Sequence, residues 1–338
     1  MNSTKAERWD GIVTSSDHGS FYQIYHWGTL LNEVHGHQLV YLEEDNGVFP
    51  LACVKSLLFG KRLISLPFAD YGGPCAKDDS TAERLISKCE EAGRRLGVNF
   101  IEIRSPHERY HDCLQAHGFM RRDDYLTFIV PLERGIEALW KGIGDKTRNR
   151  VRKAEKSGVQ VVYAADKSDL QAFYHVYGKT MKRLGSPPQP FKYFERIWDL
   201  FCPDKIFMPL ARYQGECIAG GLLFVKGREI HFAYSCSLTE YLPLAPNDMV
   251  WWHAIKWGNE HGFSRLNLGR TREGEDTVTF KKRWCAESAK MPYFYKFFGK
   301  ALEQRQEVRY RRLSRLWSKY MPESVASRVG PLIIRQIG

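Results

Sequence analysis

The stretch Cys89-Glu-Glu-Ala-Gly-Arg-Arg-Leu-Gly97, which runs directly into residues 98–103, gives the first indication of the fold. A segment that ends at a glycine is typical of a helix C-terminus, and Ile101 and Ile103 alternate as in a half-buried strand. The same order of helix, glycine and strand returns at Gly262, followed by Leu266 and Leu268. The two glycines are 165 residues apart. This spacing indicates that one structural unit occurs twice.

A second pair of segments repeats at nearly the same distance. Gly47-Val-Phe-Pro-Leu-Ala52 and Gly215-Glu-Cys-Ile-Ala-Gly220 each place a turn glycine before an apolar strand, and a further strand follows each of them. These glycines are 168 residues apart. Strand and helix patterns alternate along the whole chain, so we predict an α/β protein with mixed sheets and two tandem copies of one unit. Chance recurrence of short glycine-strand patterns is the alternative.

The predicted domain boundary follows Phe128-Ile-Val-Pro-Leu132. The first unit then spans residues 1–132, and the second spans 133–298 and begins with a basic helix at 146–157. A basic helical tail follows at 299–338, where apolar residues from Leu313 to Tyr320 fall at helical spacing among arginines. Such a helix either lies on an anionic membrane face or packs on the second unit.

The composition favours phosphate-bearing partners. Among 338 residues, 50 Lys and Arg outnumber 39 Asp and Glu, and the formal net charge is +11. Nucleic acid, a nucleotide-sugar or an anionic membrane face would match this balance. The polar start of the chain and its short apolar runs predict a cytoplasmic protein. Its eight scattered cysteines predict neither a metal site nor a disulfide framework.

The most informative stretch is Asp145-Lys-Thr-Arg-Asn-Arg-Val-Arg-Lys-Ala-Glu-Lys-Ser-Gly158. Asp145 is a good N-cap and Gly158 a good C-terminal residue for a helix of about three turns. An ordinary exposed helix usually mixes charge signs, because like charges four residues apart repel. We therefore interpret this helix as a phosphate-binding surface, with an ordinary exposed helix as the alternative. Its basic residues are Lys146, Arg148, Arg150, Arg152, Lys153 and Lys156.

The same segment resembles the corresponding stretch of FemAB-type aminoacyltransferases. The resemblance implies two tandem units of the GNAT acyltransferase fold, in agreement with the repeat. It also implies an enzyme that transfers an amino acid from aminoacyl-tRNA to the peptide stem of a peptidoglycan precursor. Other similar pieces are residues 19–27, 67–74, 180–187 and 280–284.

The end of the chain, residues 321–338, looks like a narrower FemAB-related branch that accompanies exosortase (PEP-CTERM) and exopolysaccharide systems. This resemblance implies a cell-envelope or exopolysaccharide precursor as the acceptor, in place of peptidoglycan itself. The implied donor is charged tRNA, which is a substrate, so no cofactor is expected. If the tail helix lies on a membrane and does not pack on the second unit, it would contact the inner face of that membrane.

Phe280-Lys-Lys-Arg-Trp284 follows an acidic loop after a strand. If the segment is extended, Lys281 and Lys282 point to different faces, and one of them can be buried. The resemblance implies that Phe280 and Lys281 lie where the acyl-bearing RNA end meets the acceptor, with Lys282 toward the RNA. A lysine can stabilise the oxyanion that forms when an amine attacks an ester carbonyl. The alternative is a basic surface patch beside a core Phe and Trp.

Three residues are candidates for binding the acceptor. Asp70 and Tyr71 precede two glycines in a turn that allows close backbone approach to a ligand, although a structural turn explains the pattern equally well. Arg183 is similar in position to an arginine that binds the acceptor's phosphate in the family. The family's phosphate-binding lysine of the first unit has no clear counterpart, and the candidates for its place are His35, His37 and Lys55.

The turn Tyr241-Leu-Pro-Leu-Ala-Pro-Asn247 distinguishes two possible donors. In acyl-CoA-dependent members of the fold, a glycine-rich turn here offers backbone N–H groups to a pyrophosphate. Prolines supply no N–H, so this turn argues against such a cradle. We expect Asn247 to cap the following helix, and Asp248 to act as a capping group or a general base.

Three functions are therefore compared. The first is aminoacyl transfer from charged tRNA, which requires little more of the protein than alignment of amine and ester. The second is an N-acyltransferase that uses acyl-CoA to modify an amino sugar or a related amine. The third is a non-catalytic RNA- or membrane-binding module that consists of the basic helix and the tail.

Overall fold

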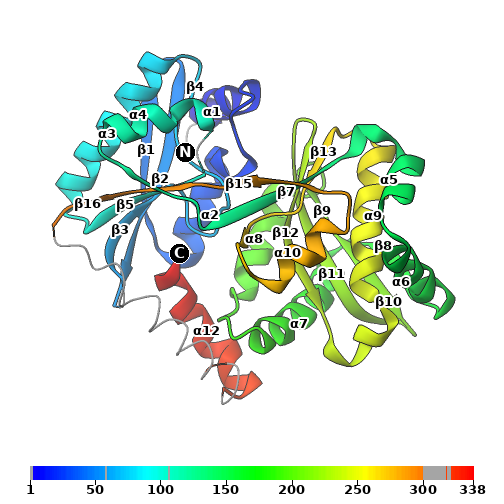
Figure 1. Cartoon of the computed structure of the whole chain (residues 1–338). Helices are drawn as coiled ribbons and strands as arrows, with labels where there is room; N and C mark the ends of the chain where they lie inside the picture. Colours follow the sequence, from blue (N-terminus) through cyan, green and yellow to red (C-terminus); the bar gives the residue numbers. More distant parts are fainter. Residues whose placement is uncertain (1–2, 58, 106, 300–316, 318–320) are drawn as a thin grey trace. The chain divides into compact units, whose positions relative to one another are not determined.

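The computed structural model describes residues 3–57, 59–105, 107–299, 317 and 321–338, and the chain divides into two compact units. The first unit contains the chain up to Asp124, a stretch that begins at Met291, and Leu332–Gly338. The second contains Tyr125–Lys290 and a later stretch that ends at Pro331. Each unit is built on one mixed β-sheet with helices packed against it (Figure 1).

The sheet of the first unit has the strand order β1-β2-β3-β5-β16-β6, with β4 beside β2. Among the strand pairs that the structure describes in this sheet, β3–β5 alone is parallel. The elements of this unit are α1 (Ser3–Ser15), η1 (Phe21–Gln23), α2 (Tyr25–His35), β1 (Gln38–Glu44), β2 (Gly47–Ser56), β3 (Gly60–Ile64), β4 (Cys75–Ala76), α3 (Asp79–Leu96), β5 (Phe100–Arg104), η2 (Glu108–Tyr110), α4 (His111–Ala116), β6 (Met120–Arg122) and β16 (Tyr293–Phe297).

The core of the first unit lies between α3 and the sheet. Phe49, Leu51 and Cys53 of β2 alternate toward this core and pack with Leu85 and Ile86 of α3. Helices α1 and α2 also contact β2. Residues 47–54 are all buried, which is the pattern of a strand that is covered on both faces. The apolar run after the turn glycine therefore reflects burial from two sides.

Both ends of α3 follow from residue types at its boundaries. Asp78 is the N-cap, and its carboxylate accepts hydrogen bonds from the Ser80 hydroxyl at 2.7 Å and the Thr81 N–H at 2.8 Å. These bonds lower the pKa of Asp78 to about 2. Gly97 ends the helix with φ of 62°, a left-handed conformation that glycine adopts without strain.

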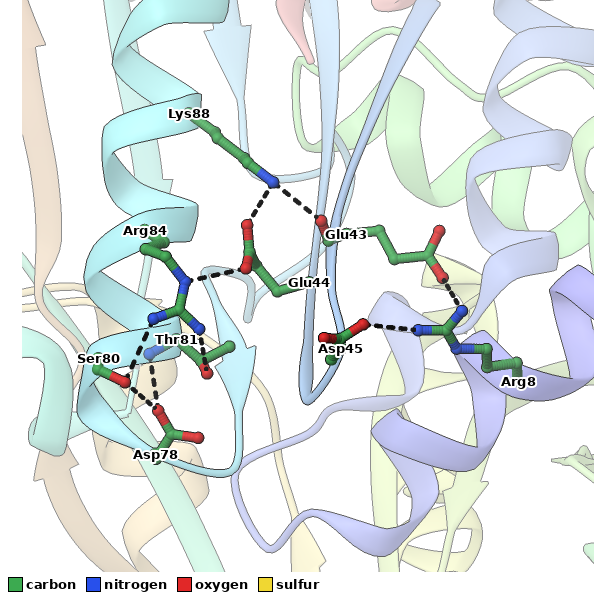
Figure 2. A network of polar contacts seen from close by, with 9 residues as sticks. All are labelled: Arg8, Glu43, Glu44, Asp45, Asp78, Ser80, Thr81, Arg84 and Lys88. Atoms are coloured by element: carbon green, nitrogen blue, oxygen red, sulfur yellow. Dashed lines mark hydrogen bonds and ion pairs between the residues drawn. The ribbon is translucent and has the colours of Figure 1, made fainter.

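Ion pairs hold the tip of the β1–β2 hairpin between α1 and α3 (Figure 2). Glu44 accepts a hydrogen bond from Nε of Arg84 at 2.9 Å and pairs with Lys88, and both partners lie on α3. On the other side, Arg8 of α1 lies 3.8 Å from the carboxylate of Glu43. Exposed pairs of this kind add little free energy of folding. Their effect is to fix the orientation of the hairpin relative to the two helices.

The sheet of the second unit has the strand order β14-β7-β13-β12-β11-β10-β8, with β15 beside β7 and β9 beside β11. Helices α7 and α9 pack against β11. The elements are β7 (Tyr125–Pro131), η3 (Leu132–Arg134), α5 (Ile136–Gly142), α6 (Asp145–Lys156), β8 (Gln160–Tyr163), α7 (Lys167–Arg183), α8 (Phe191–Phe201), β9 (Ile206–Phe207), β10 (Pro209–Tyr213), β11 (Glu216–Lys226), β12 (Glu229–Ser237), η4 (Thr239–Leu244), α9 (Pro246–Glu260), β13 (Arg265–Asn267), β14 (Thr271–Arg272), α10 (Asp276–Lys282) and β15 (Glu287–Lys290).

The two sheets confirm the predicted repeat. The order β1-β2-β3-β5 in one unit corresponds to β10-β11-β12-β13 in the other, and in both the first two pairs are antiparallel and the third is parallel. Helices α3 and α9 precede the fourth strand of each set and end just before Gly97 and Gly262. The fold therefore contains one α/β unit twice.

The next strand of each sheet comes from the other half of the chain, so the boundaries differ from those predicted. Strand β7, which contains the predicted boundary segment 128–132, pairs with β13 of the second sheet. Strand β16, predicted to close the second unit at 298, pairs with β5 and β6 of the first sheet. The division falls after Asp124 and before Met291, because strand pairing and not chain order assigns these segments.

Most of the predicted tail helix, residues 300–316 and 318–320, lies outside the described residues. Trp317 is buried, and α12 (Glu323–Ile337) follows it. Among the described residues, no helix combines the length and the apolar character that crossing a bilayer requires.

Candidate functional site

Lys281 is buried at the end of α10, in the second unit. Its Nζ donates hydrogen bonds to the carbonyl oxygens of Gly269 at 2.9 Å and Arg270 at 3.0 Å, and it lies 5.7 Å from the ring centroid of Phe128. The segment is helical and not extended, yet Lys281 is buried and Lys282 exposed. The expected separation of the two lysines is correct, although a helical turn produces it.

Phe280 rests on an aromatic base. Its ring meets Trp251 of α9 edge to face, with centroids 4.8 Å apart, and Trp284 below it is fully buried. The guanidinium carbon of Arg283 lies 4.3 Å from the centroid of the Phe280 ring. Such a contact orients the guanidinium plane over the ring. The segment after β14 thus presents a half-buried ring and an arginine on a rigid support.

Asp248, in the first turn of α9, joins this segment to the basic helix. Its side chain is fully buried, and its Oδ2 accepts bonds from Nε and Nη2 of Arg150 at 3.0 and 2.9 Å. Its Oδ1 lies 3.5 Å from Nη2 of Arg283. The N-cap of α9 is Ala245 and not Asn247. Asp248 therefore bridges two arginines, where the sequence predicted a capping group or a general base.

The start of α6 also differs from the prediction. Gly144 is the N-cap, and Asp145 lies in the first helical turn, where its carboxylate pairs with Arg148. The Arg148 guanidinium donates to the carbonyl oxygens of Trp140 at 3.1 Å, Lys141 at 2.7 Å and Ile143 at 2.6 Å. These carbonyls lie at the end of α5, where no intrahelical donor is available. Arg148 thus caps α5, and it does not line the predicted phosphate-binding row.

The other face of α6 carries the remaining cations. Val151 and Ala154 are buried, on a helix that packs against α9. Arg152 lies 5.5 Å from the Trp140 ring centroid and is exposed. Four basic side chains therefore face solvent on this helix: Lys146, Arg152, Lys153 and Lys156.

The turn before α9 offers few backbone donors. Pro246 has no N–H, and the N–H groups of Asp248 and Met249 both point to the carbonyl oxygen of Ala245, at 3.1 and 3.4 Å. Three positions of the first turn therefore offer no N–H to a ligand. This geometry does not provide the amide cradle that a CoA pyrophosphate uses at such a turn.

Asp70 and Tyr71 occupy a closely held loop of the first unit. The N–H of Gly72 donates to the carbonyl oxygen of Arg104 at 2.7 Å, and a Cβ at Gly72 would lie 2.3 Å from the carbonyl oxygen of Ser65. Only glycine fits this approach. The loop therefore holds Asp70 and Tyr71, both partly exposed, on a fixed backbone.

The first-unit candidates for phosphate binding have other surroundings. His37 Nε2 lies 2.8 Å from the carbonyl oxygen of Arg335, and burial lowers the pKa of His37. Arg62, which was not among the predicted site residues, donates to the carbonyl oxygens of Gln336 and Ile337 at 2.9 and 2.7 Å. The sequence signal that could have identified Arg62 is a charged residue within an otherwise apolar strand. His37 and Arg62 thus contact the end of α12.

The remaining candidates are separate from these clusters. His35 is buried with its ring stacked on His37, while Lys55 is exposed on β2. Arg183 is the exposed last residue of α7, in the second unit. Of the predicted site residues, the structure joins Arg150 and Phe280 through Asp248 and Arg283.

Comparison with known proteins identifies relatives that are similar over most of the chain. Residues 145–282 match the model of the acetyltransferase (GNAT) domain family. The UDP-N-acetylmuramoylpentapeptide-lysine N(6)-alanyltransferase of Weissella viridescens is 25% identical over 272 residues, which cover 73% of this chain and 80% of that protein. A lipid II:glycine glycyltransferase of Staphylococcus saprophyticus is 21% identical over 368 residues, which cover 81% of this chain and 87% of that protein.

A solved structure shares the fold of both units. The crystal structure of FemX matches with a TM-score of 0.68 at 18% sequence identity, and the match covers 93% of this chain and 99% of that one. Together these findings confirm the predicted resemblance to FemAB-like aminoacyltransferases, the tandem GNAT-like fold and the assignment as a transferase.

Proposed function

We propose that this FemAB-like chain transfers an aminoacyl group from charged tRNA to an amine of a cell-envelope or exopolysaccharide precursor, forming an amide. Two relatives support the reaction class, because their names describe alanine and glycine transfer to a muramoylpentapeptide and to lipid II. The narrower acceptor is supported by the resemblance of residues 321–338 to the PEP-CTERM-associated branch.

The observation that carries this proposal is the exposed cationic face of α6. Lys146, Arg152, Lys153 and Lys156 face solvent, whereas Arg148 and Arg150 anchor the helix. A fixed row of cations suits the regularly spaced phosphates of an RNA backbone. Because Arg148 and Arg150 anchor the first half of this helix, its backbone loses little conformational entropy on binding.

The reaction is the aminolysis of an ester. The acceptor nitrogen attacks the ester carbonyl, the bond from carbonyl carbon to ribose oxygen breaks, and the proton lost by the amine goes to the departing ribose oxygen. Alignment of the two substrates can supply about 7–11 kcal/mol of the barrier. Lys281, held by two backbone carbonyls, is the group that we assign to the developing oxyanion, and Phe280 borders the acyl group.

We assign binding of the acceptor to the remaining candidate residues. Asp70 and Tyr71 on the fixed loop supply hydrogen-bonding groups, and Arg183 supplies a cation for a phosphate. A lipid-linked acceptor would bring the protein to the inner face of the membrane, where the basic tail would meet anionic lipid.

The proposal is tested by incubating the protein with tRNA charged with labelled amino acids and with candidate envelope precursors. Mass spectrometry should detect an acceptor that has gained one aminoacyl residue. Replacement of Lys281 by Met should abolish this product without loss of RNA binding. If turnover is unchanged by this replacement, the assignment of Lys281 to the catalytic site is wrong.

The second candidate is an acyl-CoA-dependent N-acyltransferase acting on an amino sugar. The match of residues 145–282 to the acetyltransferase (GNAT) domain favours it. The few donors in the first turn of α9 weigh against it. Calorimetric titration with CoA separates the two, because tight CoA binding and acyl transfer from acyl-CoA would support this candidate.

A further inference from the structure

Arg150 and Arg283 share one buried carboxylate, although they come from distant parts of the sequence. Arg150 lies on α6, Arg283 follows α10, and Asp248 lies between them on α9. Arg150 bonds to Oδ2 through two nitrogens at 3.0 and 2.9 Å, and Arg283 approaches Oδ1 at 3.5 Å. The carboxylate thus aligns two guanidiniums beside each other.

The charges of this group do not balance. Arg150 alone would neutralise Asp248, so the guanidinium of Arg283 is in excess. Burial lowers the pKa of Arg283, and Arg150 contributes to the lowering although Asp248 opposes it. Moreover, Nε of Arg283 is buried without a hydrogen-bond partner in the part of the chain that the structure describes. A second cation that is partly desolvated and weakly paired is costly unless an anion joins it.

The side chains of both arginines are partly exposed to solvent, whereas the carboxylate is buried. The Arg150 side chain is 40% exposed and that of Arg283 29%, compared with 0% for Asp248. The guanidinium carbon of Arg283 lies 4.3 Å from the centroid of the Phe280 ring. A ligand can therefore approach the exposed part of the two arginines, and the half-buried Phe280 ring lies next to Arg283.

We propose that Arg150 and Arg283, aligned on Asp248, bind one phosphate group of the acyl donor next to Phe280. The inference rests on the proposed function and adds to it the point at which the donor is held near the reacting ester. A guanidinium pair presents several N–H donors in fixed directions, which matches the oxygens of a phosphate. The same chemistry would suit a phosphodiester of RNA or the pyrophosphate of CoA.

The test uses the full chain and two probes, an RNA hairpin that ends in an unpaired CCA and free CoA. Dissociation constants are measured at several salt concentrations for wild type and for Arg283→Gln. A second variant, Arg150→Gln combined with Asp248→Asn, removes the buried charge together with its partner, so that the fold is kept. Arg228→Gln is the matched control, because Arg228 is an exposed arginine of the same unit that pairs with Glu133 at 3.0 Å.

We expect both site variants to bind the hairpin about tenfold more weakly, since a charge-assisted contact is lost. The negative slope of log K against log salt should become shallower by about 0.7–0.9, which is the value for one phosphate contact. A purely structural role would lower the melting temperature without changing this slope. The control should retain the affinity and slope of wild type.

The outcomes separate this site from the proposed function. If CoA binding is weakened in the site variants and hairpin binding is not, the phosphate site stands as a CoA site and lends no support to an RNA donor. If both variants bind both probes like wild type, or if wild type binds neither probe, the phosphate site is overturned. When both variants bind both probes like wild type, the proposed RNA donor is unaffected, because it depends on the exposed face of α6.

Discussion

Arg148 and Arg152 lie one helical turn apart on α6 and have different surroundings. Arg148 is bonded to three carbonyl oxygens of the α5 end, while Arg152 is exposed beside Trp140. We expect Arg148→Gln to lower the free energy of unfolding by about 1–3 kcal/mol, because it leaves carbonyls without donors. Its effect on the salt dependence of RNA binding should be small. Denaturant unfolding and RNA titration measure the two quantities.

Arg152→Gln is the matched variant for this comparison. It should leave stability within about 0.5 kcal/mol of wild type and reduce the salt slope by about one phosphate contact. If the two variants had the opposite effects, the division of α6 into an anchoring side and an RNA-facing side would be wrong.

Gly72 limits the loop that carries Asp70 and Tyr71. A Cβ at this position would lie 2.3 Å from the backbone oxygen of Ser65, which cannot move without disturbing β3 and β5. We expect Gly72→Ala to lower the free energy of unfolding by about 1–3 kcal/mol and to raise KM for the acceptor. Gly11→Ala is the control. Apart from its chain neighbours and the backbone of α1, no atom of the described residues lies within 4 Å of the Cβ that it adds, so it should be neutral or stabilising by up to about 1 kcal/mol. Equal stability of the two variants would refute the steric argument.

At the residue scale, the sequence predicted which side chains are buried better than it predicted which side chains contact one another. One buried and one exposed lysine were expected at positions 281 and 282, although the expectation rested on an extended segment and the segment is helical. The bridge through Asp248 could not be predicted, because its partners are 98 residues before it and 35 residues after it. The capping role of Arg148 was equally hidden, since it depends on how the chain turns between α5 and α6.

Strand β16 is held to α3 by a buried ion pair, which makes its attachment depend on pH. Glu90 is buried, and its carboxylate lies 2.7 Å from Nζ of Lys296 and 2.8 Å from Nδ1 of His117. Burial alone would raise the pKa of Glu90, but the bonds from Lys296 and His117 outweigh it, and the pKa lies below its ordinary value of 4.5. A lowered folded-state pKa stabilises the fold above the unfolded pKa, and this stability is lost as pH falls through the folded pKa.

We therefore expect the free energy of unfolding of wild type to decrease as pH falls below about 4.5, and Glu90→Gln to show a shallower decrease. At neutral pH this variant should be less stable by about 1–3 kcal/mol, since Lys296 loses its buried partner. Denaturant unfolding across this pH range measures both effects, with the exposed neighbour Glu91→Gln as control. Parallel curves for wild type and Glu90→Gln would contradict the assignment.

Elements were predictable where local chemistry specifies them. Glycines 97 and 262 correctly marked the ends of α3 and α9, because a left-handed residue ends a helix. Helix starts were shifted, as Asp145 and Asn247 lie inside the first turn. Acidic and amide residues are also favourable there, so residue type alone does not fix the cap position.

At the scale of the whole molecule, the exchange of β7 and β16 could not be predicted. The apolar pattern of residues 125–131 fits a strand of either sheet, and only pairing with β13 assigns it to the second unit. The repeat was detectable because it preserves local order, whereas strand exchange changes none of the local patterns. A boundary drawn from sequence therefore divides both sheets incorrectly.

This exchange predicts which fragments fold. Fragment 133–298 lacks β7, whose Phe128 and Val130 are fully buried, and each such side chain contributes about 1.5–3 kcal/mol. Fragment 125–290 retains every strand of the second sheet that the structure describes.

We expect fragment 125–290 to unfold cooperatively on heating and to give dispersed amide resonances. We expect fragment 133–298 to show neither property, although the two fragments are of equal length. Fragment 1–132 should fail in the same way, because β16 is missing between β5 and β6. A cooperative transition in fragment 133–298 would show that β7 is dispensable, and the division after Asp124 would then have no energetic basis.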